Sequence, residues 1–226
     1  MDRSLARSLV YNMLATCYVY PDEKVYASIA ESEWITGFKD ALHLLDQKNF
    51  DNSLNPFEQA ISGMEEGEQS LMVREYTRLF VGACPYVIAP SYGSFYLEKE
   101  GLNSAKTTAE LLHFYHEAGF TLKEGLHDLP DHIAHELEFM GTLAGEENLA
   151  SRNEKINLEE VQMNFLSAFI LPWVPTFCEK VVEHSDFPFY HHLANLTKGI
   201  IDFEKNYLGV PEELNFRREC TTIGRY

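Results

Sequence analysis

Basic residues are scarce in this sequence of 226 amino acids. It holds 18 Lys and Arg against 35 Asp and Glu, which gives a formal net charge of −17. A field of this sign repels nucleic acid, so we expect no nucleic-acid partner. It attracts cationic peptides, with an on-rate that falls as salt rises. Acidic side chains also keep proteins soluble, and many of these carboxylates need no other explanation.

Cysteine is also rare, and it is widely spaced. The four cysteines form no Cys-x-x-Cys pair and no zinc-ribbon spacing. They are Cys17, Cys84, Cys178 and Cys220. We therefore expect reduced thiols in a cytosolic protein and no disulfide framework.

No apolar run is long enough to span a bilayer. The densest stretch, 165–174, is broken by Ser167 and Pro172, and a membrane helix needs about 20 residues. The N-terminal segment lacks the apolar core of a secretory signal peptide. We expect a soluble, cytoplasmic protein without stable membrane insertion.

Motifs for nucleotide binding and nucleophilic catalysis are missing as well. Neither G-x-G-x-x-G nor G-x-x-x-x-G-K-[ST] occurs, so phosphate groups have no recognisable cradle. Ser91 and Ser94 lie in no G-x-S-x-G frame. The sequence therefore predicts no catalytic residues, no bound cofactor and no enzyme of these classes.

Apolar residues recur at helical spacing along most of the chain. Leu5, Leu9 and Met13 lie four residues apart behind Ser4, which we expect to cap the first helix. No strand alternation, internal repeat or low-complexity tract interrupts this periodicity. We predict an all-α fold.

The predicted organisation is a single globular domain of about eight to ten helices over residues 1–214, followed by a mobile tail at 215–226. The helical pattern fails near residues 81–103, where prolines and glycines alternate with aromatic residues. A loop of this length is uncommon inside a compact domain and is often functional. We therefore predict a long aromatic- and Pro/Gly-rich loop here.

Histidines and carboxylates cluster on a helix predicted from Pro130. The cluster comprises Asp131, His132, His135, Glu136 and Glu138. His132 and Glu136 share a helix face, as do Asp131 and His135, and such pairs can bind a metal or exchange protons. The zincin pattern H-E-x-x-H fails, because Phe139 occupies the second histidine position. A helical metal-dependent hydrolase is the alternative function, and a capping or binding role is the simpler one.

Two aromatic segments, at 75–80 and 90–97, contain no nucleophile and base in a catalytic arrangement. Aromatic and aliphatic side chains with a few polar groups suit the binding of an apolar peptide. The same side chains also suit an ordinary core, which would make the protein a plain helical scaffold. Spacing alone leaves both possibilities open.

These segments resemble the TorD/DmsD family of redox-enzyme maturation chaperones, and the block at 131–140 resembles the TorD branch most. The motifs occur in the order E-Y-x-R-L-F-x-G at 75–82, P-x-Y-x-S-x-Y at 90–96, Y-x-x-A-G at 115–119, D-H-I-x-x-E-L-E-F-M at 131–140, L-P-W at 171–173 and F-Y-x-x-L-A at 189–194. The resemblance covers about residues 75–207.

The resemblance implies an all-helical chaperone that is not an enzyme and that exists as a monomer or a domain-swapped homodimer. It implies binding of the twin-arginine signal peptide, or of the apo form, of a DMSO/TMAO reductase-like molybdoenzyme. Such a chaperone assists cofactor insertion and proofreading before export. The signal-peptide-binding residues carry over to Tyr76, Leu79, Phe80, Pro90, Tyr92, Ser94, Asp131 and His132.

The physical properties of such a leader fit this resemblance. Its cationic part suits an acidic receptor, with Asp131 as a candidate partner for arginine. Its apolar part suits burial against Leu79 and Phe80, at about 25 cal/mol per Å² of apolar area. We also expect His132 to make binding sensitive to pH near neutrality.

Overall fold

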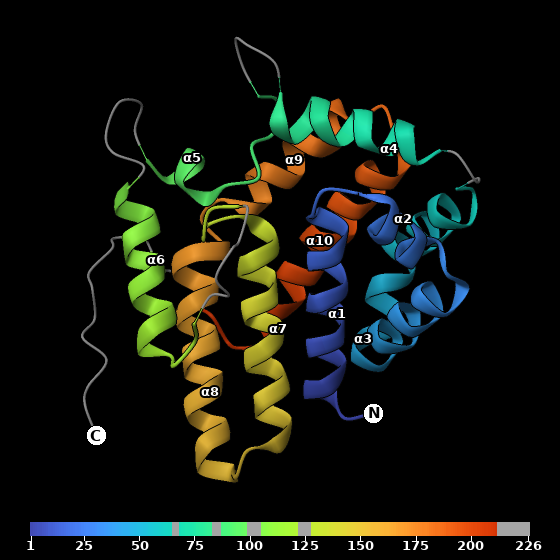
Figure 1. Ribbon diagram of the computed structural model, residues 1–226. Helices are drawn as coiled ribbons and strands as arrows, with labels where there is room; N and C mark the ends of the chain where they lie inside the picture. The colour runs from blue at the N-terminus through green and yellow to red at the C-terminus, as the bar shows by residue number, and fades with distance from the viewer. Residues whose placement is uncertain (65–67, 83–86, 99–104, 122–127, 212–226) are drawn as a thin grey trace.

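The computed structural model describes residues 1–64, 68–82, 87–98, 105–121 and 128–211, and most of these are helical (Figure 1). They form ten α-helices and two short π-helical segments, and within them the only β-type pairing is an isolated bridge between Tyr92 and His132. The all-α prediction is confirmed. The tail predicted at 215–226 lies outside the described residues.

The α-helices and η segments of the described residues follow one another along the chain. Their bounds are α1 Arg3–Tyr18, α2 Glu23–Ala30, α3 Ser32–Ser62, α4 Gln69–Tyr76, η1 Thr77–Val81, α5 Gly93–Leu97, α6 Ala105–Glu117, α7 Ile133–Leu149, α8 Arg152–Phe165, η2 Leu166–Ile170, α9 Val174–His184 and α10 Pro188–Tyr207. Both η segments are π-helical, a form often found at functional sites.

The helices α1, α7 and α8 stand side by side, with α6 outside α8 and α3 on the far side of α1 (Figure 1). α10 packs against α3 and α9. α1 and α7 approach closely at Gly141, where a Cβ would lie 2.9 Å from the Asn12 Nδ2 atom and 3.2 Å from the Tyr11 Cβ atom. Rings of α6, α7 and α8 meet in the core, where Phe139 lies 4.6 Å from Phe165 and 4.7 Å from Tyr115 between centroids. Such pairs stabilise by about 0.5–1.5 kcal/mol beyond area burial.

A buried charged cluster joins α1 to α7 and α10. The Arg7 guanidinium is fully buried and pairs with Glu147 at 2.9 Å and with Glu204 at 2.5 Å. Gln162 of α8 accepts a further hydrogen bond from Arg7 at 2.6 Å. Because each charged group here is desolvated, loss of one partner would leave another without compensation.

Helix starts differ from the sequence expectations. Asp2, rather than Ser4, caps α1, and the Ser4 hydroxyl instead donates to Glu147 at 2.6 Å. α7 begins at Ile133 rather than at Pro130, with His132 as its N-cap. Ser4 shows why such starts are hard to predict: its hydroxyl can bond to the nearby backbone or to a distant side chain, and only the nearby partner is visible in the sequence.

The predicted loop at 81–103 is partly wrong, because it contains the five-residue helix α5. Such a helix is too short to show periodicity. Residues 83–86 and 99–104 of this segment lie outside the described residues.

Within the described ranges, no single helix is both long and apolar enough to cross a membrane. The pair Arg152–Ile170 and Val174–His184 meets the length and composition criteria only in combination, and it is bent by 51°.

Candidate functional site

The motif segments at 75–82, 90–96 and 131–140 meet at the end of the molecule where α4, α5 and the start of α7 lie (Figure 1). Backbone hydrogen bonds join them: Ala89 N–H donates to the Leu79 carbonyl at 2.8 Å, and Gly93 N–H donates to the Asp131 carbonyl at 2.9 Å. Ile133 N–H donates to the Ser91 carbonyl at 2.9 Å. Segments that are far apart in the sequence are thereby held as one unit.

Asp131 is fully buried, and its carboxylate caps a helix from another part of the chain. The Oδ2 atom accepts the Ser94 backbone N–H at 2.8 Å, at the start of α5. The Thr108 hydroxyl lies 3.5 Å from the Oδ1 atom. This placement gives Asp131 a structural role and leaves its carboxylate inaccessible to a leader arginine in this conformation.

His132 is also buried, and its Nδ1 atom accepts the Ala134 N–H at 3.2 Å at the start of α7. Burial lowers the pKa of His132 to about 4, although the Asp128 carboxylate opposes this shift. The imidazole is therefore neutral near pH 7. The expectation that His132 titrates near neutrality is wrong, because burial outweighs the neighbouring carboxylates.

The three predicted residues of the first motif lie in the core. Leu79 has no exposed surface, and Tyr76 and Phe80 are almost completely buried. The Phe80 ring packs 5.1 Å from Tyr76 and 5.3 Å from Tyr190 between centroids. These side chains support the face from beneath and do not line an open groove.

The same motif shapes the chain around it. In η1 the Gly82 N–H donates to the Thr77 carbonyl at 2.6 Å, five residues back. Gly82 has φ of +64°, and a Cβ there would lie 2.9 Å from the Val87 Cα atom. Glycine is therefore required where the chain turns back toward the second motif.

Glu75 and Arg78 of this motif join α4 and η1 to the connection between α9 and α10. Arg78 donates twice to the Glu75 carboxylate, each time at 2.8 Å. Glu75 also accepts the Ser185 hydroxyl at 3.1 Å and the Asp186 N–H at 2.8 Å. Burial by itself raises the pKa of Glu75, but these hydrogen bonds outweigh it and leave the pKa below its usual value. The carboxylate therefore stays charged.

Pro90 and Ser94 are buried as well, in the segment that leads into α5. Beneath it, the Trp173 indole donates to the Glu136 carboxylate at 3.0 Å and stacks on the Tyr96 ring at 5.3 Å. Burial raises the pKa of Glu136 well above its usual value. Trp173 and Glu136 thus hold the second motif against α7.

Tyr92 is the one predicted aromatic site residue that is partly exposed. Its hydroxyl donates to the Asp128 carboxylate at 2.9 Å, and Asp128 is itself partly exposed. Tyr20 lies nearby with 52% of its surface exposed, and its ring is 5.6 Å from that of Tyr76. Burial raises the pKa of Tyr76, and the Asp128 carboxylate, Tyr92 and Tyr20 raise it further through electrostatic interaction, so all three lie within electrostatic range of Tyr76. We define Tyr20, Tyr92 and Asp128 as the motif face.

Sequence reasoning did not select Tyr20 or Asp128 as site residues. Asp128 lies before Pro130, outside the histidine cluster, and Tyr20 lies outside the motif segments. The one available signal was Tyr20-Pro21-Asp22, an aromatic residue at a helix end. It does not distinguish an exposed ring from a buried one.

Within the described part of the chain, the histidine cluster is not arranged as a metal site. Among the described residues, no group of three His, Cys, Asp or Glu side chains is arranged to hold a metal ion. Glu136 is committed to Trp173, and Glu138 is exposed to solvent. The rings of His132 and His135 lie 5.9 Å apart, and no third ligand from the described part of the chain joins them. The geometry does not support the hydrolase alternative.

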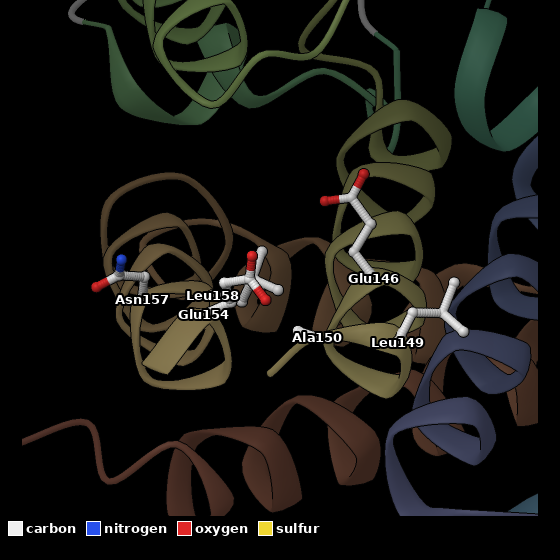
Figure 2. A pocket seen from close by; sticks show the side chains of 6 residues that line it. All are labelled: Glu146, Leu149, Ala150, Glu154, Asn157 and Leu158. Carbon is white, nitrogen blue, oxygen red and sulfur yellow. The ribbon is translucent and has the colours of Figure 1, made fainter. Parts of the chain in front are cut away.

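Neither of two surface cavities is lined by a predicted site residue. One, of about 430 Å³, lies between the ends of α7 and α8 and is lined by Glu146, Leu149, Ala150, Glu154, Asn157 and Leu158. Figure 2 shows Leu149, which is 87% exposed, on the side of α7 away from α8. The other lies between α3 and α10. The motif face therefore belongs to neither of these two cavities.

Comparison with known proteins agrees with the motif resemblance. The chain is 27% identical to chaperone protein TorD from Shewanella sp. (strain ANA-3), with 92% of this chain and 96% of that protein covered. It is 28% identical to chaperone protein TorD from Photobacterium profundum, covering 67% and 71%. A crystal structure from Archaeoglobus fulgidus, described as a putative redox enzyme maturation protein, matches with a TM-score of 0.58 at 21% identity, covering 86% of this chain and 93% of the other.

The family model described as nitrate reductase delta subunit matches residues 45–179, which is more than half of the chain. The family resemblance predicted from the motifs is confirmed. The chain belongs to the nitrate reductase delta subunit family, the family of the TorD chaperones.

Proposed function

We propose that this protein is a cytoplasmic chaperone for a molybdopterin oxidoreductase and is not itself a catalyst. It binds the twin-arginine signal peptide, the apo form of the enzyme, or both, and it assists cofactor insertion and proofreading before export. Family membership supports the chaperone class. The motif face supports the peptide-binding step.

The observation that carries the proposal is the composition of that face. It presents a mostly exposed tyrosine, a partly exposed tyrosine and a carboxylate on a scaffold fixed by hydrogen bonds. Tyrosine rings offer apolar area with little conformational entropy to lose, and they bind apolar peptide segments well. Asp128 supplies the charge that a leader arginine needs. The net charge of −17 adds attraction at longer range.

The exposed residues of the motif face, and not the buried motif residues, are the proposed contacts with the leader. Asp131, Leu79 and Phe80 hold the face in place, while Asp128, Tyr92 and Tyr20 meet the peptide. Phe95 of α5 adds a ring that is 55% exposed, with the Lys180 ammonium 5.6 Å from its centroid. Exposed rings of this kind contribute by burial, at about 25 cal/mol per Å² of apolar area.

Calorimetric titration with the leader of a neighbouring oxidoreductase tests the proposal. We expect saturable binding that weakens as salt rises. Asp128→Asn should weaken binding by about two- to fivefold, as for a partly exposed ion pair, and should reduce the salt dependence. Asp40→Asn on α3 is the matched control, because Asp40 is exposed and its loss changes the net charge equally.

Two results would contradict the proposal. One is the absence of wild-type affinity for any such leader at tens of micromolar peptide. The other is equal affinity for a leader in which both arginines and the apolar stretch are scrambled. If wild type binds and Asp128→Asn binds equally well, only the placement of the arginine contact is wrong.

A further inference from the structure

A second concave surface lies between the middle of α3 and the last turns of α10. Its volume is about 490 Å³, within the roughly 300–1,000 Å³ range of small-ligand pockets. It is lined by Asp46, Asn49, Phe50, Gly199, Asp202, Phe203, Asn206 and Tyr207. We call it the α3–α10 pocket.

The α3–α10 pocket is separate from the motif face. Tyr207 packs over Arg7, near the beginning of α1, whereas Tyr76 donates to the Tyr18 carbonyl at the end of that helix. Arg7 and Tyr18 are eleven positions apart in α1, and at 1.5 Å per residue the distance between them along the helix axis is roughly 16 Å. A single side chain cannot reach both places.

Three aromatic rings form the apolar part of the pocket. Phe50 is buried, and its ring meets that of Phe203 edge-on at 5.5 Å between centroids. The Phe203 and Tyr207 rings are stacked at 6.0 Å with an angle of 17°. Phe203 and Tyr207 are only partly buried. Because the Arg7 guanidinium already lies 4.4 Å from the Tyr207 centroid, a ligand would meet chiefly the Phe203 ring.

Two carboxylates accompany these rings, and none of the eight described lining residues is basic. Asp46 interrupts α3 and accepts the Asn49 side-chain amide at 2.6 Å. Asp202 is exposed, and its backbone carbonyl accepts the Asn206 amide at 2.9 Å, which leaves its carboxylate outside that bond. The pocket thus pairs negative charge with aromatic rings.

This combination matches the arginine side chain. A guanidinium is planar, stacks on aromatic rings and pairs with carboxylates, whereas an ammonium does so less well. The protein already uses the same contact internally, with the Arg7 guanidinium 4.4 Å from the Tyr207 centroid. We propose that the α3–α10 pocket binds an arginine side chain of the client polypeptide, at a site distinct from the motif face. The identity of the partner as the client rests on the function proposed above.

Nuclear magnetic resonance titration of the full chain with three capped tripeptides tests this inference. They are Gly-Arg-Gly, Gly-Lys-Gly and Gly-citrulline-Gly, where citrulline keeps the shape of arginine without its charge. The arginine peptide should shift the Gly199 amide and the Asn49 and Asn206 side-chain amides in a saturable way. The lysine peptide should bind more weakly, and the citrulline peptide should cause no saturable shift.

Variants locate the contact within the pocket. Asp202→Asn should weaken the arginine peptide by about two- to fivefold. Phe203→Leu should weaken it by a similar factor through loss of the ring face. Glu160→Gln, an exposed carboxylate on α8, should leave the affinity unchanged. If Phe203→Leu does not fold, Asp202→Asn still decides the outcome.

Four outcomes would overturn the inference. They are equal binding of the citrulline peptide, no effect of Asp202→Asn, equal or tighter binding of free arginine, and self-association that Asp202→Asn abolishes. Free arginine carries a carboxylate that the two aspartates repel, so tight binding of it would indicate a small-molecule site. A surface used for self-association would indicate a second copy of this chain.

Titration of the client leader in the same samples separates this inference from the proposed function. Shifts at Tyr92 and Asp128 without arginine-dependent shifts at Gly199 would sustain the function and refute the pocket. Arginine-dependent shifts at Gly199 without leader binding would give the opposite result.

Discussion

Asp131 and Asp128 offer a test that separates support of the binding face from contact with the partner. The Asp131 carboxylate is buried and accepts the Ser94 N–H at 2.8 Å. Asp131→Ala removes this acceptor and leaves the N–H in a buried position. A buried donor without a partner costs about 1–3 kcal/mol, and loss of a helix cap costs about 0.5–2 kcal/mol. Because both figures describe the same bond, we expect about 1–3 kcal/mol less stability in total.

Asp128→Ala should behave differently. It removes the bond from the Tyr92 hydroxyl at 2.9 Å, but both groups are partly exposed, so water can replace the lost partner. We expect a stability loss of about 1 kcal/mol or less. The larger effect should be on leader binding, which should weaken and lose part of its salt dependence.

Thermal unfolding and leader titration at two salt concentrations measure both effects on the same samples. For a domain of this size, each loss of about 1 kcal/mol should lower the Tm by roughly 2–4 °C. Asp131→Ala should lower the Tm and leave the salt dependence of leader binding unchanged. Asp128→Ala should change the Tm little and reduce the salt dependence of leader binding. An unchanged Tm together with a flattened salt slope for Asp131→Ala would refute the reasoning, since it would mean that Asp131 meets the leader.

Three further predictions follow from buried groups. Leu79→Ala should reduce the free energy of unfolding, measured by urea denaturation, by about 2–5 kcal/mol, because Leu79 is fully buried. A loss below about 1 kcal/mol would mean that Leu79 is exposed. Arg7→Met should cost about 3–5 kcal/mol, since it leaves Glu147 and Glu204 desolvated without their cation; an equally stable variant would contradict this. The folded-state pKa of His132, about 4, is below the usual 6.5, so the stability that neutral His132 contributes is complete above pH 6.5 and is lost as pH falls toward 4. His132→Asn keeps a capping acceptor and should reduce this pH-dependent change in the free energy of unfolding by up to about 3 kcal/mol. Unfolding measured at a series of pH values tests this. If His132 is not responsible, stability will change with pH as steeply in the variant as in wild type.

Most helices could be predicted because each buries one face, which imposes a period on the sequence. α10 is the clearest example: Pro188 can begin a helix, and Leu193, Leu196 and Ile200 recur at helical spacing on its buried face. α3 shows the limit of this reasoning. Asn55-Pro56 resembles a helix start, but the chain is helical from Ser32 to Ser62 with an interruption at Asp46. Pro56 lies inside a helix, where local rules alone would place a start.

The candidate site could be predicted in its composition but not in its exposure. The motif order indicated that segments around Tyr76, Tyr92 and His132 belong together, and hydrogen bonds do join them. Periodicity cannot tell a buried aromatic residue from one that lines a groove, because both lie on the apolar face of a helix. Tyr76 is buried and Tyr92 is partly exposed for reasons that depend on distant parts of the chain.

The buried polar residues explain why the motifs indicate the family more clearly than the client. Glu75, Asp131 and Glu136 each bond to a group from another segment, namely Ser185, Ser94 and Trp173. A buried polar group is stable only with such a partner, so its identity is set by the fold. Tyr20 is mostly exposed and Asp128 is partly exposed, so water can replace a lost partner there and these residues can vary with the peptide that they meet. Specificity for the client should therefore be sought in residues that border the motifs and not in the motifs themselves.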